Sequence, residues 1–320
     1  MFKFKYPFII GEAGSNFNQN FNNAKKLIKT AKSCGADAVK FQLFNAKKLY
    51  PDNIKMQKIF LSMQLNKNWI PKLIQYSKKI NIHFFLSIFD SSSLSFIKKY
   101  NLDLYKIASS EVTNFELLKR FKNVKQTILL STGMSDLDDV YKAVKIIKKK
   151  VVIMQCCSIY PLPIKETNLL VLNQFKKKFP NCILGFSDHT ESDLPAIVAV
   201  GLGAKVFEKH ITLNKKSKGL DHKYAYEPMQ FKKYVKNIRE AFTCLGSSDK
   251  NLLYEEKKYG RRNGIYLSKN LKKNTILKRN MIKFMSPAIG IRDKFYKSII
   301  GKKLKLNLKK NDALFKYHIK

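Results

Sequence analysis

The sequence predicts a (β/α)8 barrel followed by a small β-rich domain. Short runs of β-branched and aromatic residues alternate eight times with segments of helical periodicity between residues 8 and 245. After Gly246 this alternation stops, and residues 261–320 hold only short alternating runs between Lys- and Asn-rich turns. Eight successive strand–helix units are what a (β/α)8 barrel requires. We therefore assign the barrel to the first part of the chain and a separate domain to the last.

Eight segments have the composition of buried strands. They are Phe8–Ala13, Ala38–Phe44, His83–Phe89, Tyr105–Ser109, Thr127–Thr132, Val151–Ser158, Ile183–Ser187 and Lys205–Thr212. The helical segments between or after them include Asn22–Cys34, Ser91–Tyr100, Asn114–Phe121, Asp136–Lys149, Asn168–Phe179, Asp193–Leu202 and Met229–Leu245. Asn114 and Ser135-Asp136 stand where two helices begin, as capping residues do. A doubly wound sheet is the alternative, but the first turn, Gly11-Glu-Ala-Gly-Ser-Asn, does not match a dinucleotide-binding fingerprint.

The predicted organisation has three parts. Residues 1–248 form the barrel, residues 249–260 a charged linker, and residues 261–320 the β-rich domain. Within this last part the alternating runs are Gly264–Leu267, Thr275–Leu277 and Leu304–Leu308.

The chain carries a formal net charge of +39. Only six of its 62 basic residues are arginines, and the lysines are spread along the whole chain. Recognition of bases and phosphates favours arginine, so we expect a lysine-rich solvated surface and no nucleic-acid binding. Such a surface would still attract an anionic substrate.

The composition also predicts a cytoplasmic protein. No apolar stretch approaches the ~20 residues of a membrane-spanning helix, so no membrane association is expected. The first residues show no apolar region followed by a cleavage site, and we expect no signal peptide. The five cysteines are odd in number and contain no CxxC pair, which favours reduced thiols.

Polar residues occur at or near the carboxyl end of every predicted strand. In a barrel of this kind, reactive groups lie at those ends and in the loops that follow. The residues are Glu12, Lys40, Gln42, Ser87, Lys106, Ser109, Glu111, Ser131, Ser158, Tyr160, Ser187, His189 and His210. Any one of them alone could simply mark where a strand leaves the core. Together, two lysines and five serines form a set that can hold a phosphate and a carboxylate.

His189 and His210 follow neighbouring strands and could share a divalent cation. With two protein ligands the ion would keep open positions for water and substrate, which suits a Lewis acid. A pair of hydrogen-bonded histidines is the alternative.

Seven segments, in order along the barrel, resemble the sialic acid (N-acetylneuraminate) synthase family, which includes legionaminate and pseudaminate synthases. They are Ile9–Asn16 (IIGEAGSN), Gly35–Gln42 (GADAVKFQ), Tyr105–Ser109 (YKIAS), Leu130–Met134 (LSTGM), Ser158–Pro163 (SIYPLP), Gly185–Thr190 (GFSDHT) and Gly203–His210 (GAKVFEKH). The last part of the chain, with Arg261-Arg262, Leu271-Lys-Lys and Ile299-Ile-Gly-Lys-Lys, resembles the antifreeze-like (SAF) domain of that family.

The resemblance implies that the chain condenses phosphoenolpyruvate with an acylated amino-sugar aldehyde. It implies that phosphoenolpyruvate is bound by Lys40, Ser87, Lys106, Ser109, Ser131, Ser158 and Ser187. His189 and His210 would carry Mn²⁺ or Mg²⁺, and Glu12 would be the catalytic acid/base. Gln42, Glu111, Tyr160, Asp221 and Arg262 would bind the acceptor sugar.

Two loops depart from the family pattern. Many members have Asn-His-Asn-Gly after the first strand, whereas this chain has Asn16-Phe17-Asn18-Gln19. The loop Gly219–Pro228 keeps an Asp-His pair but differs beside it. These departures leave open which nine-carbon acid is made: neuraminic, legionaminic or pseudaminic.

Two other functions compete with this interpretation. A phosphoenolpyruvate-dependent synthase that acts on a sugar phosphate would favour an arginine cluster at the strand ends, and no arginine stands there. A nucleic-acid-binding protein would leave the carboxylates and histidines of the rim without a role.

The resemblance further implies a homodimer that exchanges its C-terminal domains. In such a dimer an arginine of one subunit reaches the acceptor sugar of the other. We choose Arg262 for this residue. Arg261 is the alternative, because the local sequence Arg-Asn-Gly differs from the family pattern and leaves the alignment of the two arginines open.

Overall fold

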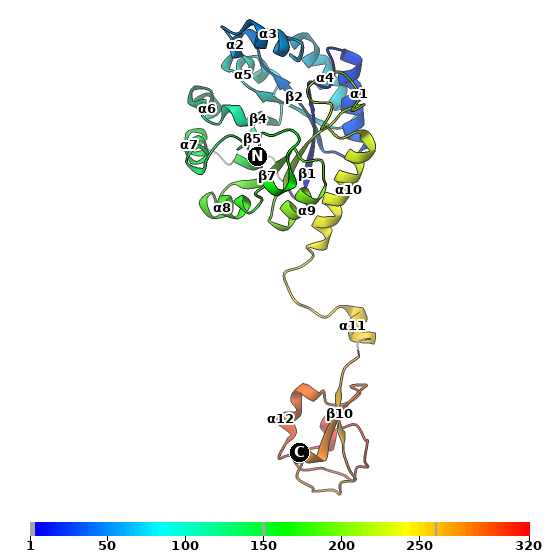
Figure 1. The fold of residues 1–320 in the computed structure, drawn as a ribbon. Coiled ribbons are helices and arrows are strands. Elements are labelled where there is room, and N and C mark those ends of the chain that lie inside the picture. The colour runs from blue at the N-terminus through cyan, green and yellow to red at the C-terminus, as the bar shows by residue number, and fades with distance from the viewer. Residues whose placement is uncertain (1–3, 149–150, 260) are drawn as a thin grey trace. The chain divides into compact units, whose positions relative to one another are not determined.

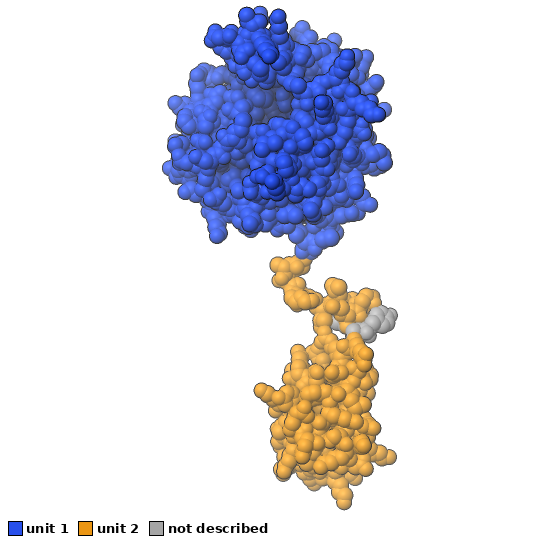
Figure 2. All heavy atoms as spheres, in the orientation of Figure 1, with its two compact units in different colours: residues 1–246 blue, residues 247–320 orange. Residues whose placement is uncertain are grey.

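The computed structural model describes residues 4–148, 151–259 and 261–320. Lys149, which ends a predicted helix, and Gly260, which ends the predicted linker, lie outside these residues. The chain divides into two compact units, residues 1–246 and 247–320, which are coloured separately in Figure 2. Each unit is described by itself.

The first unit is a closed barrel of eight parallel strands in sequence order, with helices outside it (Figure 1). The strands are β1 (Phe8–Gly14), β2 (Ala38–Leu43), β3 (His83–Ile88), β4 (Leu104–Ile107), β5 (Thr127–Ser131), β6 (Val151–Cys156), β7 (Ile183–Asp188) and β8 (Val206–His210). Hydrogen bonding between β8 and β1 closes the ring. The predicted barrel is therefore confirmed, and the doubly wound alternative is wrong.

The longer helices of this unit follow the strands. They are α1 (Phe21–Ser33), α4 (Ile70–Lys79), α5 (Ser91–Lys98), α6 (Phe115–Phe121), α7 (Leu137–Ile147), α8 (Val171–Lys178), α9 (Leu194–Gly201) and α10 (Pro228–Cys244). The predicted caps are confirmed: Asn114 accepts a hydrogen bond from the backbone N–H of Leu117 (3.1 Å), and Asp136 accepts one from Asp139 (2.9 Å). None of the described helices is long and apolar enough to cross a membrane.

The segment between β2 and β3 contains helices that were not predicted. These are α2 (Ala46–Leu49), α3 (Ile54–Leu61) and α4. Asn45 and Asn53 cap the first two through their side chains. Pro51 stands between these two helices, and each is too short to show a clear apolar period.

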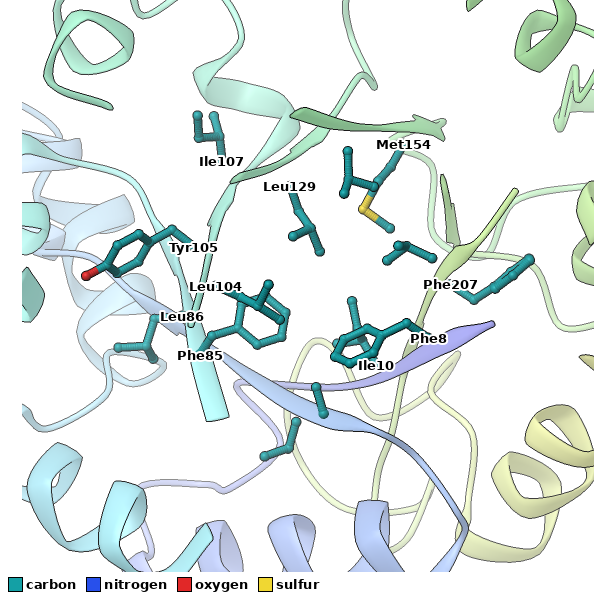
Figure 3. Close-up of a cluster of buried hydrophobic side chains, with 14 of the residues drawn as sticks. Phe8, Ile10, Phe85, Leu86, Leu104, Tyr105, Ile107, Leu129, Met154 and Phe207 are labelled. Carbon is teal, nitrogen blue, oxygen red and sulfur yellow. The ribbon is translucent and has the colours of Figure 1, made fainter. Parts of the chain in front are cut away.

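The barrel interior is filled by apolar side chains below a polar layer. Ile10, Phe85, Leu129 and Met154, from four strands, are fully buried and lie in one cluster (Figure 3). Because side chains alternate between the faces of a strand, the residue two positions further along shares the interior face, one layer higher. These residues are Glu12, Ser87, Ser131 and Cys156. The strand period therefore places polar groups together at the carboxyl end of the barrel.

The second unit has a core of its own. Strand β9 (Gly264–Leu267) pairs antiparallel with β10 (Ile282–Met285), and short bridges join the remaining chain. Its buried apolar residues include Ile265, Leu277 and Leu314. It also contains two short helices, α11 (Tyr254–Tyr259), inside the predicted linker, and α12 (Tyr296–Ile299).

Candidate active site

The polar layer surrounds a cavity of about 310 Å³ at the carboxyl ends of the strands. The cavity brings together twelve of the residues that the sequence predicted. They are Glu12, Lys40, Gln42, Ser87, Lys106, Ser109, Ser131, Ser158, Tyr160, Ser187, His189 and His210. It also contains Cys156 and Glu208, which the sequence reasoning missed.

Strand pairing fixes which of these side chains are neighbours. Glu12 lies opposite Lys40 across β1 and β2, and opposite His210 across β1 and β8. Ser187 lies opposite Glu208 across β7 and β8. The site is thus built on the rigid frame of the barrel, which holds these groups in place before any substrate binds.

Two buried lysines lie at the centre of the layer. Lys40 Nζ lies 2.6 Å from Ser87 Oγ and 2.7 Å from Glu12 Oε2. Lys106 Nζ donates to Ser131 Oγ at 2.6 Å. Both lysines are only 2% exposed. Two ammonium groups with hydroxyls beside them can hold a small ligand that carries more than one negative charge.

Glu208 lies between the two lysines. Its Oε1 is 3.5 Å from Lys40 Nζ and 4.0 Å from Lys106 Nζ, and it accepts a hydrogen bond from Ser187 Oγ (3.3 Å). The signal for this residue was present in the sequence. Glu208 precedes His210 by two positions in a strand, so the two side chains share the interior face.

The two carboxylates have opposite preferences for a proton. Burial raises the pKa of Glu12 to about 7, with Lys40 opposing and Glu208 adding to the shift. Burial also disfavours charge on Glu208, but Lys106 and Lys40 together hold the pKa of Glu208 below its ordinary value. Glu208 therefore stays ionised while Glu12 can gain or lose a proton near neutral pH. A group with such a pKa is suited to general acid/base catalysis.

The two histidines lie side by side, with ring centroids 5.6 Å apart. His189 Nδ1 lies 2.7 Å from the backbone carbonyl of Cys157, which leaves Nε2 free of that contact. His210 Nδ1 is buried without a hydrogen-bond partner, and burial holds the pKa of His210 well below its ordinary value. His210 is thus a neutral imidazole with an unused nitrogen, and His189 is oriented by the carbonyl of Cys157. Both features are typical of histidines that bind a metal ion.

Cys156, another residue of the cavity lining, contacts His189. Its Sγ lies 3.9 Å from His189 Nδ1 and accepts a hydrogen bond from Ser109 Oγ at 3.5 Å. Burial alone would raise the pKa of the thiol, but His189 and these hydrogen bonds lower it to about 7. Cys156 could not be singled out from the sequence, because it lies at the end of a largely apolar strand.

Asp221 lies at the edge of the site, in the loop between β8 and α10. Its Oδ2 accepts hydrogen bonds from the backbone N–H (3.1 Å) and the hydroxyl (2.8 Å) of Ser15. Its Oδ1 accepts a hydrogen bond of 2.6 Å from the hydroxyl of Tyr224. Asp221 thus ties the loop after β8 to the loop after β1.

Two of the predicted site residues of the first unit, Asp221 and Glu111, are not among the residues that line the cavity. Glu111 is buried in its own loop, where its oxygens accept hydrogen bonds from Ser110 Oγ (3.0 Å) and Asn114 Nδ2 (2.7 Å). Arg262 belongs to the second unit, where its backbone carbonyl accepts a hydrogen bond from Ser286 Oγ (3.1 Å).

Comparison with known proteins gives a consistent result. Residues 27–250 match the NeuB family. The chain is 33% identical to the N,N'-diacetyllegionaminic acid synthase of Campylobacter jejuni, over 97% of this chain and 99% of that protein. It is 31% identical to the pseudaminic acid synthase of the same organism, over 97% and 96%. The crystal structure of the N-acetylneuraminic acid synthetase of Leptospira borgpetersenii, 29% identical, superposes with a TM-score of 0.76 over 80% of this chain and 90% of that one.

Proposed function

The chain belongs to the NeuB family, and we propose that it condenses phosphoenolpyruvate with an N-acylated amino-sugar aldehyde. The products would be a nine-carbon sialic-type acid and inorganic phosphate. The observation that carries this proposal is the polar layer, in which two buried lysines, six serines and two carboxylates meet in one cavity.

Phosphoenolpyruvate matches the cationic part of this layer. Lys40, with Ser87, and Lys106, with Ser131, supply charge and hydroxyl groups at two points. A molecule with a phosphate and a carboxylate on neighbouring atoms can use both points at once. Ser109, Ser158 and Ser187 line the same cavity and complete the proposed binding set.

Glu12 is the group that we assign to proton transfer. In the proposed reaction the enol carbon of phosphoenolpyruvate bonds to the aldehyde carbon, and the aldehyde oxygen gains a proton to become a hydroxyl. The carbon that bears the phosphate thereby becomes cationic, and water adds to it and loses a proton. The new hydroxyl then loses its proton to form the ketone carbonyl, and phosphate leaves as the C–O bond breaks. A carboxyl whose pKa lies near 7 can accept or give the protons of these steps. Glu208, which lines the same cavity, would stabilise this positive centre by its negative charge.

We propose that His189 and His210 hold Mn²⁺ or Mg²⁺. When bound there, the cation would polarise the aldehyde oxygen of the acceptor. Among the described residues no group of three or more His, Cys, Asp or Glu side chains is placed to hold a metal ion. Two histidines alone would leave the remaining positions to water and substrate, as a Lewis-acid site needs.

We propose that the acceptor is an unphosphorylated amino sugar, N-acetylmannosamine or a related diacetamido hexose, bound by Gln42, Glu111, Tyr160, Asp221 and Arg262. The barrel has two arginines, and neither faces the cavity: Arg120 lies on α6 beside Glu116, and Arg239 on α10 bonds to Asp37. A phosphorylated acceptor would favour such a residue at the rim. A synthase acting on a sugar phosphate remains the second candidate.

The proposed working form is a cytoplasmic homodimer with exchanged antifreeze-like domains. The five cysteines form no disulfide with one another, as expected in a reducing compartment. Residues 247–320 form a unit with its own core, a precondition for exchange between subunits.

The direct test is product analysis by mass spectrometry. Phosphoenolpyruvate is offered with a panel of 2-acetamido and 2,4-diacetamido hexoses and, in parallel, their 6-phosphates. We expect a nine-carbon acid and stoichiometric phosphate from an unphosphorylated member. Product only from a sugar phosphate would select the second candidate, and no product from any member would contradict both.

A further inference from the structure

We propose that Tyr224 determines which N-acyl group the acceptor carries. With Tyr160 it forms an aromatic wall beside the two histidines, and this wall limits the length of the acyl chain. The inference rests on the proposed function, because it concerns the acceptor of that reaction. Tyr224 was not among the residues that the sequence predicted for the site.

Four aromatic rings lie together here: those of Tyr160, His189 and His210, which line the cavity, and that of Tyr224, which packs against Tyr160 and His210. The Tyr160 ring lies 4.1 Å from that of His189 and 5.9 Å from that of His210, centroid to centroid. The Tyr224 ring lies 5.0 Å from Tyr160 and 5.1 Å from His210. The two tyrosines therefore stand directly beside the proposed metal-binding pair, and their rings offer an apolar surface.

Hydrogen bonding holds Tyr224 in this position. Its hydroxyl donates to Asp221 Oδ1 at 2.6 Å, and Ser15 fixes the other oxygen of the same carboxylate through two donors. Tyr224 is only partly exposed, whereas Tyr160 is 46% exposed. With both oxygens of Asp221 engaged, the carboxylate anchors the wall.

The chemistry of the acceptor places its acyl group at this wall. In a 2-acylamino aldehyde the nitrogen is carried by the carbon bonded to the aldehyde carbon. An aldehyde oxygen held at His189 and His210 therefore brings the acyl group next to the same two rings. The methyl end of an acetyl group can pack on an aromatic face, but a longer chain must displace a ring that Asp221 holds.

One extra methylene that does not fit an apolar pocket lowers kcat/KM by about 10–200-fold, and this range sets the expected size of the effect. We expect the wild type to use an N-butanoyl amino sugar at least ~10-fold less well than the N-acetyl form. Tyr224→Ala should shrink this ratio by at least ~10-fold. Tyr224→Phe keeps the ring but loses the hydrogen bond to Asp221, so its ratio should lie between those of the wild type and Tyr224→Ala.

The experiment measures kcat/KM for the N-acetyl, N-propanoyl and N-butanoyl forms of the hexosamine that the wild type accepts. The full chain is used, at saturating phosphoenolpyruvate. Tyr6→Ala is the matched control, because Tyr6 is 59% exposed and precedes β1, at the opposite end of the barrel. Its acyl preference should equal that of the wild type, and the fluorescence of the single tryptophan, Trp69, checks folding of each variant.

The outcomes separate the two proposals. If the wild type converts an amino sugar and Tyr224→Ala keeps the wild-type acyl ratio, the role of Tyr224 is overturned and the proposed function stands. If the wild type converts no amino sugar at all, the proposed function fails, and the inference about Tyr224 fails with it. A ratio that collapses in Tyr224→Ala but not in Tyr6→Ala supports the proposal.

Discussion

Asp188 and Lys209 form a buried ion pair, with 2.9 Å between Asp188 Oδ2 and Lys209 Nζ, and each directly precedes a histidine of the site. The two residues are opposite one another across β7 and β8. Since side chains alternate along a strand, His189 and His210 point into the cavity and the ion pair lies behind them. Lys209 Nζ also lies 4.3 Å from the centroid of the Tyr226 ring. The pair therefore fixes the ends of both strands that carry the histidines.

Replacing Lys209 by Met should destabilise the barrel by about 3–5 kcal/mol, because Asp188 would remain buried without its partner. The free energy of unfolding can be measured by denaturant titration of Trp69 fluorescence, which reports on the barrel. Lys236→Met is the matched control, because Lys236 is an exposed lysine of α10 paired with Glu240 and should contribute about 0–1 kcal/mol. Equal stability of the two variants would contradict the structural role of the pair.

Glu12→Gln should lower kcat by ~10²–10⁴-fold with little change in KM, because proton transfer is realised in the transition state. The amide keeps the size of the side chain and removes the ionisable group. Steady-state kinetics with both substrates measure the effect, and Glu116→Gln, an exposed position on α6, is the control. A Glu12→Gln variant with near-normal kcat would assign the proton transfer to another group.

Glu208→Gln should shift the part of the pH–activity profile that reports the titration of Glu12 to lower pH. The charge of Glu208 raises the pKa of Glu12, so its removal lowers that pKa. In the wild type Lys40 pairs with both carboxylates. In the variant it would pair with Glu12 alone, which lowers the pKa of Glu12 further. The pH dependence of residual kcat/KM, or infrared titration of the carboxyl band, measures the shift. A profile that stays in place or moves to higher pH would show that the two carboxylates do not interact in this way.

Most of the barrel could be predicted because each strand carries its own signal. Apolar runs such as Ile128–Leu130 are bounded by polar residues, and the strand period then places those residues in one layer. The short helices α2 and α3 could not be predicted, because their stability depends on caps and on tertiary contacts rather than on an apolar period.

The site was predictable where a polar residue ends a strand, as for Ser131 and Ser187. Glu208 was overlooked although it shares the interior face of its strand with His210, because its two lysine neighbours come from distant strands. The position of Tyr224 depends on a contact with Asp221 in an irregular loop, which has no periodic signal. The orientation of Glu111 could not be predicted either, because it depends on local hydrogen bonds to Ser110 and Asn114.

Removal of divalent cations should abolish turnover, and Mn²⁺ or Mg²⁺ should restore it. Replacing His189 or His210 by Ala should remove most of this recovery and weaken Mn²⁺ binding to the chelator-treated protein, measured by calorimetry in the absence of substrate. His83→Ala is the control, because His83 opens β3 at the opposite end of the barrel. Full activity of both site variants in the presence of chelator would contradict the proposed metal site.

The exchanged-domain dimer makes a prediction about mixed subunits. If the C-terminal unit of one subunit completes the site of the other, Glu12→Gln and Arg262→Ala should each be inactive alone, because each removes one part of every site. In a heterodimer of the two, one hybrid site receives an intact Glu12 from one chain and an intact Arg262 from the other.

The mixture should therefore regain activity, up to about half of the wild-type value per heterodimer. Arg262 is favoured over Arg261 because its backbone is tied to Ser286 within the second unit, whereas Arg261 is exposed. Arg261→Ala is the paired control and should retain activity by itself. The two inactive chains are mixed under conditions that exchange subunits, and the heterodimers are isolated by two affinity tags before assay. Isolated heterodimers without activity, or a wild-type enzyme that sediments as an active monomer, would show that the second unit does not act across subunits.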